Sequence, residues 1–444
     1  MQDQLTALLD SIEDHHVQLV QLWFTDVLGV LKSISITPAE LEHSLIEGMT
    51  FDGSAIDGFS RVQESDILAK PDPKTFQLLP FDDDGLVVGR VICDLYNLDG
   101  SPFEGCPRQV LRKALSKAHA MGLSFFAAPE IEYFYLDSKA TSNGLRFLDE
   151  GAYFEQTVSD LASNLRKRSV MAIEGMGIPV EHSQHEDAPG QHEIDLRYGE
   201  ALWMADAVMT ARHLIKEVAH HQGVLATFMP KPVPEAQGSG MHTHFSLFEG
   251  NDNVFYDGSD TYGLSKLAKS FIAGLLMHAK EITAVTNQWV NSYKRLVVGY
   301  EAPVYVSWAR NNRSALVRVP MHRRHHPSSC RIEYRAPDPA CNPYLAFALV
   351  LAAGLDGVNN NYPLPEEASA NLWTLTPHEL ASEGITSLPD SLYEAVGMME
   401  QSELVAETLG EHVFEWFIRN KKEEWLAYKR QVSQFEIDRY LHRL

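Results

Sequence analysis

The chain has 444 residues, with 37 basic and 60 acidic side chains and a formal net charge of −23. This length exceeds that of an average domain, so we expect two domains. The acidic balance argues against nucleic acid as a partner, and the charge is not gathered in blocks that would predict disorder.

The cysteines and the apolar runs indicate a cellular setting. Four cysteines, at positions 93, 106, 330 and 341, have unrelated spacings that predict neither a zinc knuckle nor a disulfide framework. This usage is typical of a reducing, cytoplasmic compartment. The N-terminus lacks the basic and apolar regions of a signal peptide. The longest apolar run, 345–355, is far short of the roughly 20 residues of a membrane span, so we expect no membrane association.

The N-terminal part alternates short apolar segments with turns. It predicts a helix at 2–14, a hairpin of strands at 16–27 and 31–36, a helix at 37–48, and strands at 76–80 and 85–94. Together these elements predict a small sheet crossed by a helix. Gly, Ser and Pro then concentrate between Asp99 and Pro107, so we expect one domain at 1–104 and a second at 105–444.

The larger part alternates strands with helices. Strands are predicted at 124–136, 226–229 and 242–248, and helices at 107–121, 161–176, 199–222, 264–287, 391–408 and 411–428. Asn342-Pro343 is a helix-entry signal before the apolar run, which therefore predicts a buried core helix.

The segment 180–196, V-E-H-S-Q-H-E-D-A-P-G-Q-H-E-I-D-L, concentrates carboxylate and imidazole groups. Glu186 and Glu193 stand on either side of a Pro-Gly turn, which can bring two extended segments side by side. Carboxylates and phosphate oxygens are the ligands that Mg²⁺ and Mn²⁺ prefer. Taken alone, however, such a segment is more often a solvated turn.

Two further segments place possible ligands on one strand face. Glu130 and Glu132 are two residues apart in an apolar strand, and the apolar flanks favour a buried position over a water-facing one. His242 and His244 follow the glycine-rich turn that begins at Gly238, where backbone can approach a ligand closely. An ordinary loop explains that turn equally well.

Arg331, Glu333 and Arg335 alternate in charge along one strand. A carboxylate between two guanidinium groups suits a metal beside an anionic substrate, although a surface salt-bridge ladder is an equal alternative. Three more arginines lie within a short span, namely Arg295, Arg313 and Arg318. Five carboxylates and one imidazole bracketed by arginines indicate two divalent ions and phosphoryl transfer. The sequence contains no P-loop or kinase glycine-rich motif, so a nucleotide is held differently.

Six motifs then carry a resemblance to a known family. They are F-D-G-S-A-I-D-G-F (51–59), P-E-I-E-Y-F (129–134), H-E-D-A-P-G-Q-H-E-I (185–194), G-S-G-M-H-T-H (238–244), N-S-Y-K-R-L-V-V-G-Y-E-A-P (291–303) and R-I-E-Y-R-A-P-D-P-A-C-N-P-Y-L (331–345). In this order, over nearly the whole chain, they resemble the type I glutamine synthetases. The resemblance implies an α+β fold, with a small β-grasp-like N-terminal domain and a larger catalytic domain with a curved antiparallel sheet and flanking helices. It also implies a dodecamer of two hexameric rings with active sites between subunits.

The resemblance assigns roles residue by residue. Ligands of a first Mg²⁺ or Mn²⁺ ion match Glu132, Glu186 and Glu193, and those of a second match Glu130, His242 and Glu333. Nucleotide-side positions match Tyr198, His244, Ser246, Arg318 and Arg331. Glutamate-binding positions match Gly238, Arg295 and Arg335. Catalytic positions match Asp52, Glu301 and Arg313, with Tyr153 beside Asp52 in the ammonium pocket.

The implied reaction is the ATP-dependent ligation of ammonia to the γ-carboxylate of L-glutamate through a γ-glutamyl phosphate. Glu301 closes a loop over the site, and Asp52 of a neighbouring subunit takes a proton from ammonium. A second hypothesis is that a polyamine or another primary amine replaces ammonia. A third is a non-catalytic relative, which the presence of all six metal positions disfavours.

Some positions depart from the family pattern. Gln237 stands where Asn is usual and Ala55 where a second Ser is common, which leaves room for a larger amine. Trp373 occupies the place of a tyrosine that some members adenylylate, so we expect the short, non-adenylylated class. Arg61 matches an arginine linked to feedback inhibition in that class.

Overall fold

The computed structural model describes residues 2–54, 56, 58–59, 66–81, 85–137, 146–156, 161–310, 312–321, 326–368 and 371–444. The N-terminal elements are α1 (Gln2–Asp14), β1 (Leu19–Thr25), β2 (Leu31–Ile36), α2 (Pro38–Ile46), β3 (Met49–Asp52), β4 (Asp66–Pro71), β5 (Gln77–Leu78) and β6 (Val88–Tyr96).

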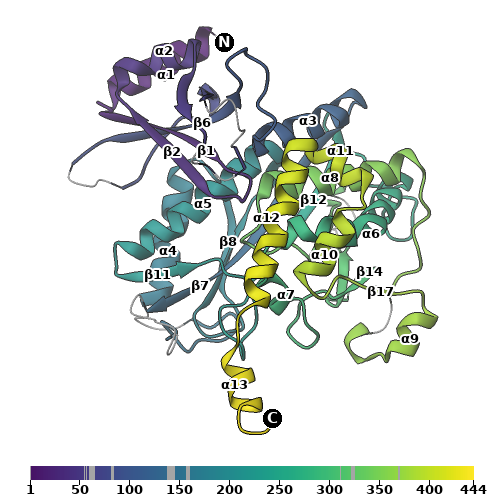
Figure 1. The fold of residues 1–444 in the computed structure, drawn as a ribbon. Helices are drawn as coiled ribbons and strands as arrows, with labels where there is room; N and C mark the ends of the chain where they lie inside the picture. Colours follow the sequence, from purple (N-terminus) through teal and green to yellow (C-terminus); the bar gives the residue numbers. More distant parts are fainter. Residues whose placement is uncertain are drawn as a thin grey trace.

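The N-terminal strands form one sheet in the order β2-β1-β6-β4-β3, with β5 also paired to β6. The predicted hairpin of β1 and β2 is confirmed, and β1 pairs in parallel with β6. Figure 1 shows α1 and α2 lying beside this sheet, in a lobe at one end of the molecule. The strand predicted at 76–80 is shorter than expected, because a turn capped by the Asp72 carboxylate precedes it and Pro80 has no N–H to pair.

The larger part of the chain contains α3 (Pro107–Ala120), β7 (Ser124–Asp137), α4 (Leu161–Gly175), β8 (Val180–His185), β9 (Gln191–Leu196), β10 (Gly199–Glu200), α5 (Ala201–His220), β11 (Val224–Thr227), β12 (Thr243–Glu249), β13 (Asp252–Asn253), α6 (Lys266–Thr286), α7 (Ser292–Arg295), β14 (Tyr305–Ala309), β15 (Ala315–Arg318), β16 (Ile332–Tyr334), α8 (Pro343–Asn359), α9 (Pro377–Ser382), β17 (Thr386–Ser387), α10 (Leu392–Met399), α11 (Glu403–Leu409), α12 (Glu411–Lys429) and α13 (Gln434–Tyr440).

The second sheet runs in the order β17-β14-β15-β16-β12-β7-β9-β8. Its pairs are antiparallel except for β14 with β15, so the sheet is mixed rather than purely antiparallel. The helices flank it, and the expected α+β class is confirmed. No helix in the described part of the chain combines the length and the apolar composition needed to cross a bilayer.

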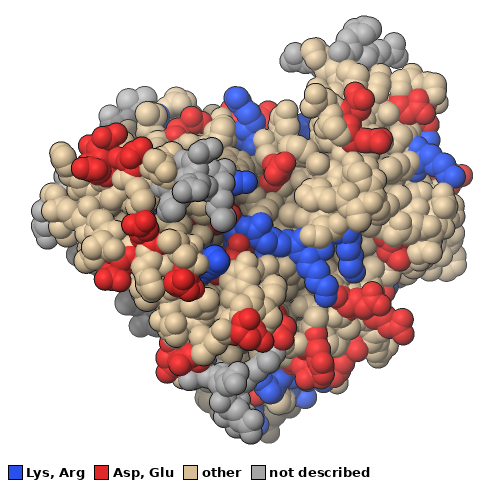
Figure 2. Space-filling view, turned by 90° about the horizontal axis from the view of Figure 1, so that it is seen from above, with Lys and Arg blue, Asp and Glu red and all other residues tan. Residues whose placement is uncertain are grey.

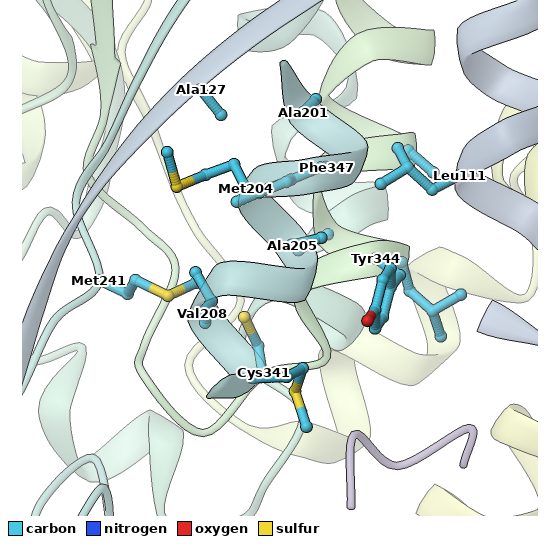
Figure 3. Packing of buried hydrophobic residues seen from close by; sticks show 14 of the residues in the cluster. Leu111, Ala127, Ala201, Met204, Ala205, Val208, Met241, Cys341, Tyr344 and Phe347 are labelled. Carbon is cyan, nitrogen blue, oxygen red and sulfur yellow. The ribbon is translucent and has the colours of Figure 1, made fainter. Parts of the chain in front are cut away.

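Helix α5 packs its apolar stripe into the centre of the core. Ala201, Met204, Ala205 and Val208 recur at helical spacing and are buried. Figure 3 shows this stripe between Ala127 of β7 on one side and side chains of α3 and α8 on the other. The stripe thereby fixes α5 against the strand that carries the two acids at 130 and 132.

Two predictions about helices have different outcomes. The buried helix after Asn342 is confirmed as α8, and the Asn342 side chain accepts hydrogen bonds from the backbone N–H groups of Tyr344 and Leu345. The single helix predicted at 391–408 is wrong, because the chain forms α10 and α11 instead. Ser402 caps the start of α11 by accepting from the Val405 N–H, and it donates to Glu281 on α6.

A buried charge network joins the N-terminal sheet to the larger part. Arg108 of α3 is 4% exposed and contacts Asp72 (3.0 Å) and Asp94 (2.8 Å), which belong to the N-terminal part. It also contacts Asp206 of α5 (2.8 Å), which accepts a hydrogen bond from the Tyr344 hydroxyl (2.7 Å). Arg108 is therefore the shared cation of three carboxylates that come from both parts of the chain.

We expect Arg108→Met to lower the midpoint of guanidinium unfolding strongly, because the buried Asp206 loses its ion-pair partner, while Asp72 and Asp94 keep only the partly exposed Arg112. Removing one partner of a buried ion pair costs about 3–5 kcal/mol. Circular dichroism at a fixed protein concentration measures the change. The control is Lys422→Met, since Lys422 pairs with Glu400 at 2.6 Å with both side chains nearly half exposed. Equal midpoints for the two variants would show that the network does not stabilise the fold.

Charge is unevenly distributed over the surface. Figure 2 shows Lys and Arg side chains gathered in a band across the middle of one face, while Asp and Glu are spread around it. The net charge of −23 therefore does not make every part of this face acidic.

Candidate active site

All six predicted metal ligands line one cavity of about 230 Å³ on the face of the second sheet. The prediction that these scattered residues converge is confirmed. The same cavity is lined by Tyr153, Gly238, Arg295, Glu301, Arg313, Arg318 and Arg335. Of the residues predicted for catalysis and glutamate binding, Asp52 alone lies elsewhere, at the end of β3 in the N-terminal sheet, where its side chain is exposed.

The register of the sheet explains the convergence. Residues directly opposite each other on paired strands share one face, as do residues two apart on one strand. Glu132 is opposite Glu193, and Glu193 is opposite Gln184. On the other side of β7, His244 of β12 is opposite Glu333, which is opposite Arg318. Strand pairing therefore sets the site residues in a row across β15, β16, β12, β7, β9 and β8.

Glu130, His242 and Glu333 form a compact group of possible metal ligands. One ligand atom from each lies within 4.8 Å of the others. His242 Nδ1 is 3.3 Å from Glu130 Oε2 and 4.0 Å from Glu333 Oε1. Arg335 Nη1 donates to Glu333 Oε1 (2.7 Å), and Arg318 Nε donates to the other oxygen. The two arginines thus fix the orientation of the Glu333 carboxylate beside Glu130 and His242.

The other three predicted ligands accept hydrogen bonds from amide groups. The Gln184 amide donates to Glu186 Oε1 (2.9 Å) and to Glu193 Oε1 (2.8 Å). Glu132 Oε2 accepts from the Gly240 N–H (2.8 Å) and from the Gln191 amide (3.1 Å). Neutral donors therefore hold these three carboxylates around a shared space.

The electrostatics of this space fit a cation. Burial raises the pKa of Glu132 to about 8, and the Glu186 carboxylate adds to the effect. Burial also raises the pKa of Glu186 to about 7 and raises that of Glu193 well above its ordinary value. Although burial opposes it, hydrogen bonds from His242 and His244 hold the pKa of Glu130 well below its ordinary value. The raised pKa values show that too little positive charge lies near these crowded carboxylates. Divalent cations bound among them would supply it.

A second group with metal-like spacing, Asp149, His185 and His192, has another explanation. Asp149 accepts from His185 Nε2 (2.7 Å) and from His192 Nε2 (3.1 Å). Arg166 Nη1 donates to His192 Nδ1 (2.7 Å), so the proton of this neutral ring stays on Nε2 and blocks that nitrogen as a ligand. His185 Nδ1 donates to the Glu186 carbonyl (2.6 Å), so the group instead positions Glu186.

A separate pocket of about 370 Å³ lies beside the cavity. It is lined by four of the five predicted nucleotide-side residues, namely Tyr198, His244, Ser246 and Arg331. Glu130, His182 and Asp195 line both spaces, which therefore adjoin. The fifth residue, Arg318, lines the cavity itself. The Tyr198 and Phe126 rings lie 6.0 Å apart on this pocket and offer an aromatic surface to a flat ligand.

Glycine backbone and a buried arginine form the wall near Gly238. Arg295 is 3% exposed, and its guanidinium donates to the Ala336 carbonyl (2.7 Å). A Cβ at Gly240 would lie 2.5 Å from Arg295 Nη2, so any larger residue there would displace this guanidinium beside the backbone N–H that donates to Glu132. Glu301 sits across the cavity with a left-handed backbone (φ +57°), which is uncommon for a residue other than glycine.

His182, Gln184 and Asp195 are among the residues of the cavity wall that were missed from the sequence. His182 Nε2 lies 2.9 Å from an Asp195 oxygen, and with Glu193 they form a third group with metal-like spacing. Alternation on β8 was the available signal, because positions 182, 184 and 186 share a face.

Comparison with known proteins agrees with this geometry. Residues 16–98 match the family model "Glutamine synthetase, beta-Grasp domain", and residues 104–440 match "Glutamine synthetase, catalytic domain". The chain belongs to the glutamine synthetase family. A glutamine synthetase of Mycolicibacterium smegmatis is 54% identical over 99% of this chain and 100% of its own length. One of Thermotoga maritima is 46% identical over 97% and 98%, respectively.

Solved structures of glutamine synthetase and of GmaS share the fold. Plasmodium falciparum glutamine synthetase superposes with a TM-score of 0.88 at 26% identity, over 98% of each chain. A complex of GmaS with ADP superposes with a TM-score of 0.86 at 32% identity, over 98% of this chain and 99% of that one.

The positions that depart from the glutamine synthetase pattern are partly visible. Gln237 lines the cavity, and its amide donates to an Asp187 oxygen (3.3 Å). Trp373 is half-buried at the turn after Asn371. Ala55 and Arg61 lie outside the described residues.

Proposed function

We propose that this chain ligates ammonia to the γ-carboxylate of L-glutamate, with ATP converted to ADP and phosphate through a γ-glutamyl phosphate. It is a ligase of the glutamine synthetase family, and its relatives at 44–54% identity carry that name over nearly the full length. The observation that carries the proposal is the single cavity that unites the five carboxylates proposed as metal ligands, His242 and four arginines beside an aromatic pocket.

Two divalent ions, Mg²⁺ or Mn²⁺, fit the donor set. Glu132, Glu186 and Glu193 would hold one, and Glu130, His242 and Glu333 the other. Hard cations prefer such oxygen-rich sites, and the raised carboxyl pKa values support cations in this space. When bound, the ions supply Lewis-acid stabilisation of the charge on the transferred phosphoryl group.

The chain's own residues orient the first step. The pocket lined by Tyr198, His244, Ser246 and Arg331 receives ATP with its phosphates toward the cavity. Arg295 and Arg335, with the backbone of Gly238, bind glutamate. A γ-carboxylate oxygen then attacks the terminal phosphorus and ADP leaves, while Arg313 and Arg318 neutralise the charge that develops.

The second step needs ammonia close to the acyl phosphate. The Glu186 and Glu301 carboxylates attract ammonium electrostatically. Burial, with the nearby Glu186 carboxylate, raises the pKa of Tyr153 to about 12, so its hydroxyl stays neutral and can accept from ammonium. Asp52 of a neighbouring subunit takes a proton from ammonium, and the ammonia nitrogen attacks the acyl carbon. Phosphate leaves and takes up the second proton that the nitrogen loses as the amide forms. Glu301 covers the site against water.

A homododecamer of two hexameric rings is part of the proposal. Asp52 lies away from its own chain's cavity, which supports a site completed by a neighbour. Helix α13 projects from the body, and Phe435 within it (62%) and Leu441 just after it (68%) are exposed, which supports docking of this segment on another copy. We also infer a cytoplasmic location, supported by four free, buried cysteines.

The direct test measures ATP-dependent phosphate release and glutamine formation with glutamate plus either ammonium or putrescine. We expect glutamine and phosphate in equal amounts with ammonium, and little phosphate with putrescine. Turnover with putrescine alone would identify a ligase for larger amines instead.

We expect the affinity for Mg²⁺ to rise with pH, because ligand carboxyls must lose their protons to bind. The pKa values of about 8 for Glu132 and about 7 for Glu186 set the window at about pH 6 to 8. Both lie above the ordinary value of 4.5, so the metal-free folded state binds extra protons and its stability falls as pH rises through this window. Calorimetry in two buffers measures the proton release, and thermal unfolding measures the stability. An affinity independent of pH would contradict this prediction.

A further inference from the structure

The loop that carries Glu301 makes a specific contact with a buried lysine. We call residues 297–302 the flap. Val298 and Glu301 of the flap are exposed, and its backbone adopts left-handed conformations at Gly299 (φ +97°) and Glu301 (φ +57°). Between them, the Tyr300 ring centroid lies 3.6 Å from the Lys231 ammonium. This is a close cation–π contact, and it sits directly beside the residue proposed to cover the site.

Lys231 is itself held in place. Its side chain is 7% exposed, and its ammonium also donates to the Ala236 carbonyl. Its backbone N–H donates to the Asn291 side chain (2.7 Å), whose amide donates back to the Lys231 carbonyl (3.0 Å). The ammonium is therefore a fixed point against which the Tyr300 ring rests.

The same lysine lies between the flap and the glutamate-binding wall. Asn291 immediately precedes α7, which ends with Arg295, and Ala236 immediately precedes Gln237 and Gly238 on the cavity. A Cβ at Gly238 would lie 2.6 Å from the Pro230 carbonyl, so the residue before Lys231 packs against that wall. If the flap moved away from Lys231, Glu301 would thus move away from the cavity wall that carries Gly238 and Arg295, while that wall stayed in place.

We propose that Lys231 is a positioning residue that latches the flap over the cavity through the Tyr300 ring. The inference rests on the proposed function, in which the flap protects an acyl phosphate. Without the latch the flap opens more often, and water reaches the intermediate. One water then adds to γ-glutamyl phosphate to give glutamate and inorganic phosphate, so ATP is consumed without glutamine.

The experiment compares four single variants of the full-length enzyme. Lys231→Met keeps the length of the side chain but removes the charge, and Tyr300→Leu removes the ring. Tyr300→Phe keeps the ring and serves as the rescue. Lys294→Met is the matched control, because the Lys294 ammonium also lies over a ring, that of Tyr428 (5.3 Å), and contacts no flap residue through it.

Two measurements report on the latch. The first is the ratio of phosphate released to glutamine formed, together with ammonium-independent phosphate release in the presence of ATP and glutamate. The second is the rate at which glutamyl endopeptidase cuts the Glu301–Ala302 bond in the substrate-free enzyme. The strength of a cation–π contact implies increases of about two- to thirtyfold for Lys231→Met and Tyr300→Leu. Tyr300→Phe and Lys294→Met should match the wild type. A fifth variant that combines Lys231→Met with Tyr300→Leu should be no worse than the worse of those two single variants, because both remove the same contact.

Wild-type values for both Lys231→Met and Tyr300→Leu would overturn the proposal. A Tyr300→Phe variant as uncoupled as Tyr300→Leu would also overturn it, because the ring would not be the partner. If the wild-type enzyme forms no glutamine at all, the proposed function fails, yet the cleavage rates still decide whether Lys231 holds the flap.

Discussion

Replacing Glu333 with Gln should lower kcat/KM for glutamine formation on the order of a thousandfold. The Glu333 side chain is fully buried, and its two oxygens accept from Arg318 and Arg335. The change preserves shape but removes the charge that would hold a cation with Glu130 and His242. It also turns an amide NH₂ toward an arginine donor, so the guanidinium groups lose their anchor. Steady-state kinetics and calorimetric Mg²⁺ titration measure both losses.

The matched control is Glu367→Gln. Glu367 also binds an arginine, with Arg310 Nη2 at 2.9 Å, but this pair is partly exposed and does not line the cavity. Its loss should change kcat/KM by no more than about twofold. If the Glu333→Gln variant kept wild-type turnover and Mg²⁺ affinity, the proposed metal role of Glu333 would be wrong.

Much of the site was predictable because alternation along a strand fixes which side chains share a face. The pairs Glu130/Glu132 and His242/His244 follow from spacing alone, and the Pro-Gly turn correctly predicts that Glu186 and Glu193 face one space. The helix signal at Asn342 likewise depends on local chemistry, namely a side-chain cap followed by proline. Features of this kind can be predicted from the sequence because they depend on residues within a single segment.

The order of strands in the sheet was not predictable from these local rules. The position of β7 between β9 and β12 decides that Glu130 and Glu132 face ligands that lie far from them in the sequence. The amide of Gln184 became visible as a bridge only once its neighbours across the strand were known. The helix predicted at 391–408 failed for a similar reason, because Ser402 makes a tertiary contact with α6 that favours a cap over helix continuation.

Asp52→Ala and Glu333→Gln should each be nearly inactive alone yet restore activity when present in one assembly. Loss of a proton acceptor typically costs about a hundredfold or more. In the proposed ring, each site combines the cavity of one subunit with Asp52 of its neighbour. With equal random mixing, half the cavities are intact and half of their neighbours carry Asp52, so about one quarter of the sites are complete.

Co-expression of the two variants with different affinity tags, followed by purification through both tags, yields the mixed assembly. Its specific activity should approach about one quarter of the wild-type value. Each variant assembled alone, and the two mixed after assembly, are the controls and should stay inactive. Because Asp52 lies on β3 and does not line the cavity of its own chain, a site made within one subunit predicts no recovery. An inactive mixed assembly would therefore contradict a site that is completed by Asp52 of a neighbouring subunit.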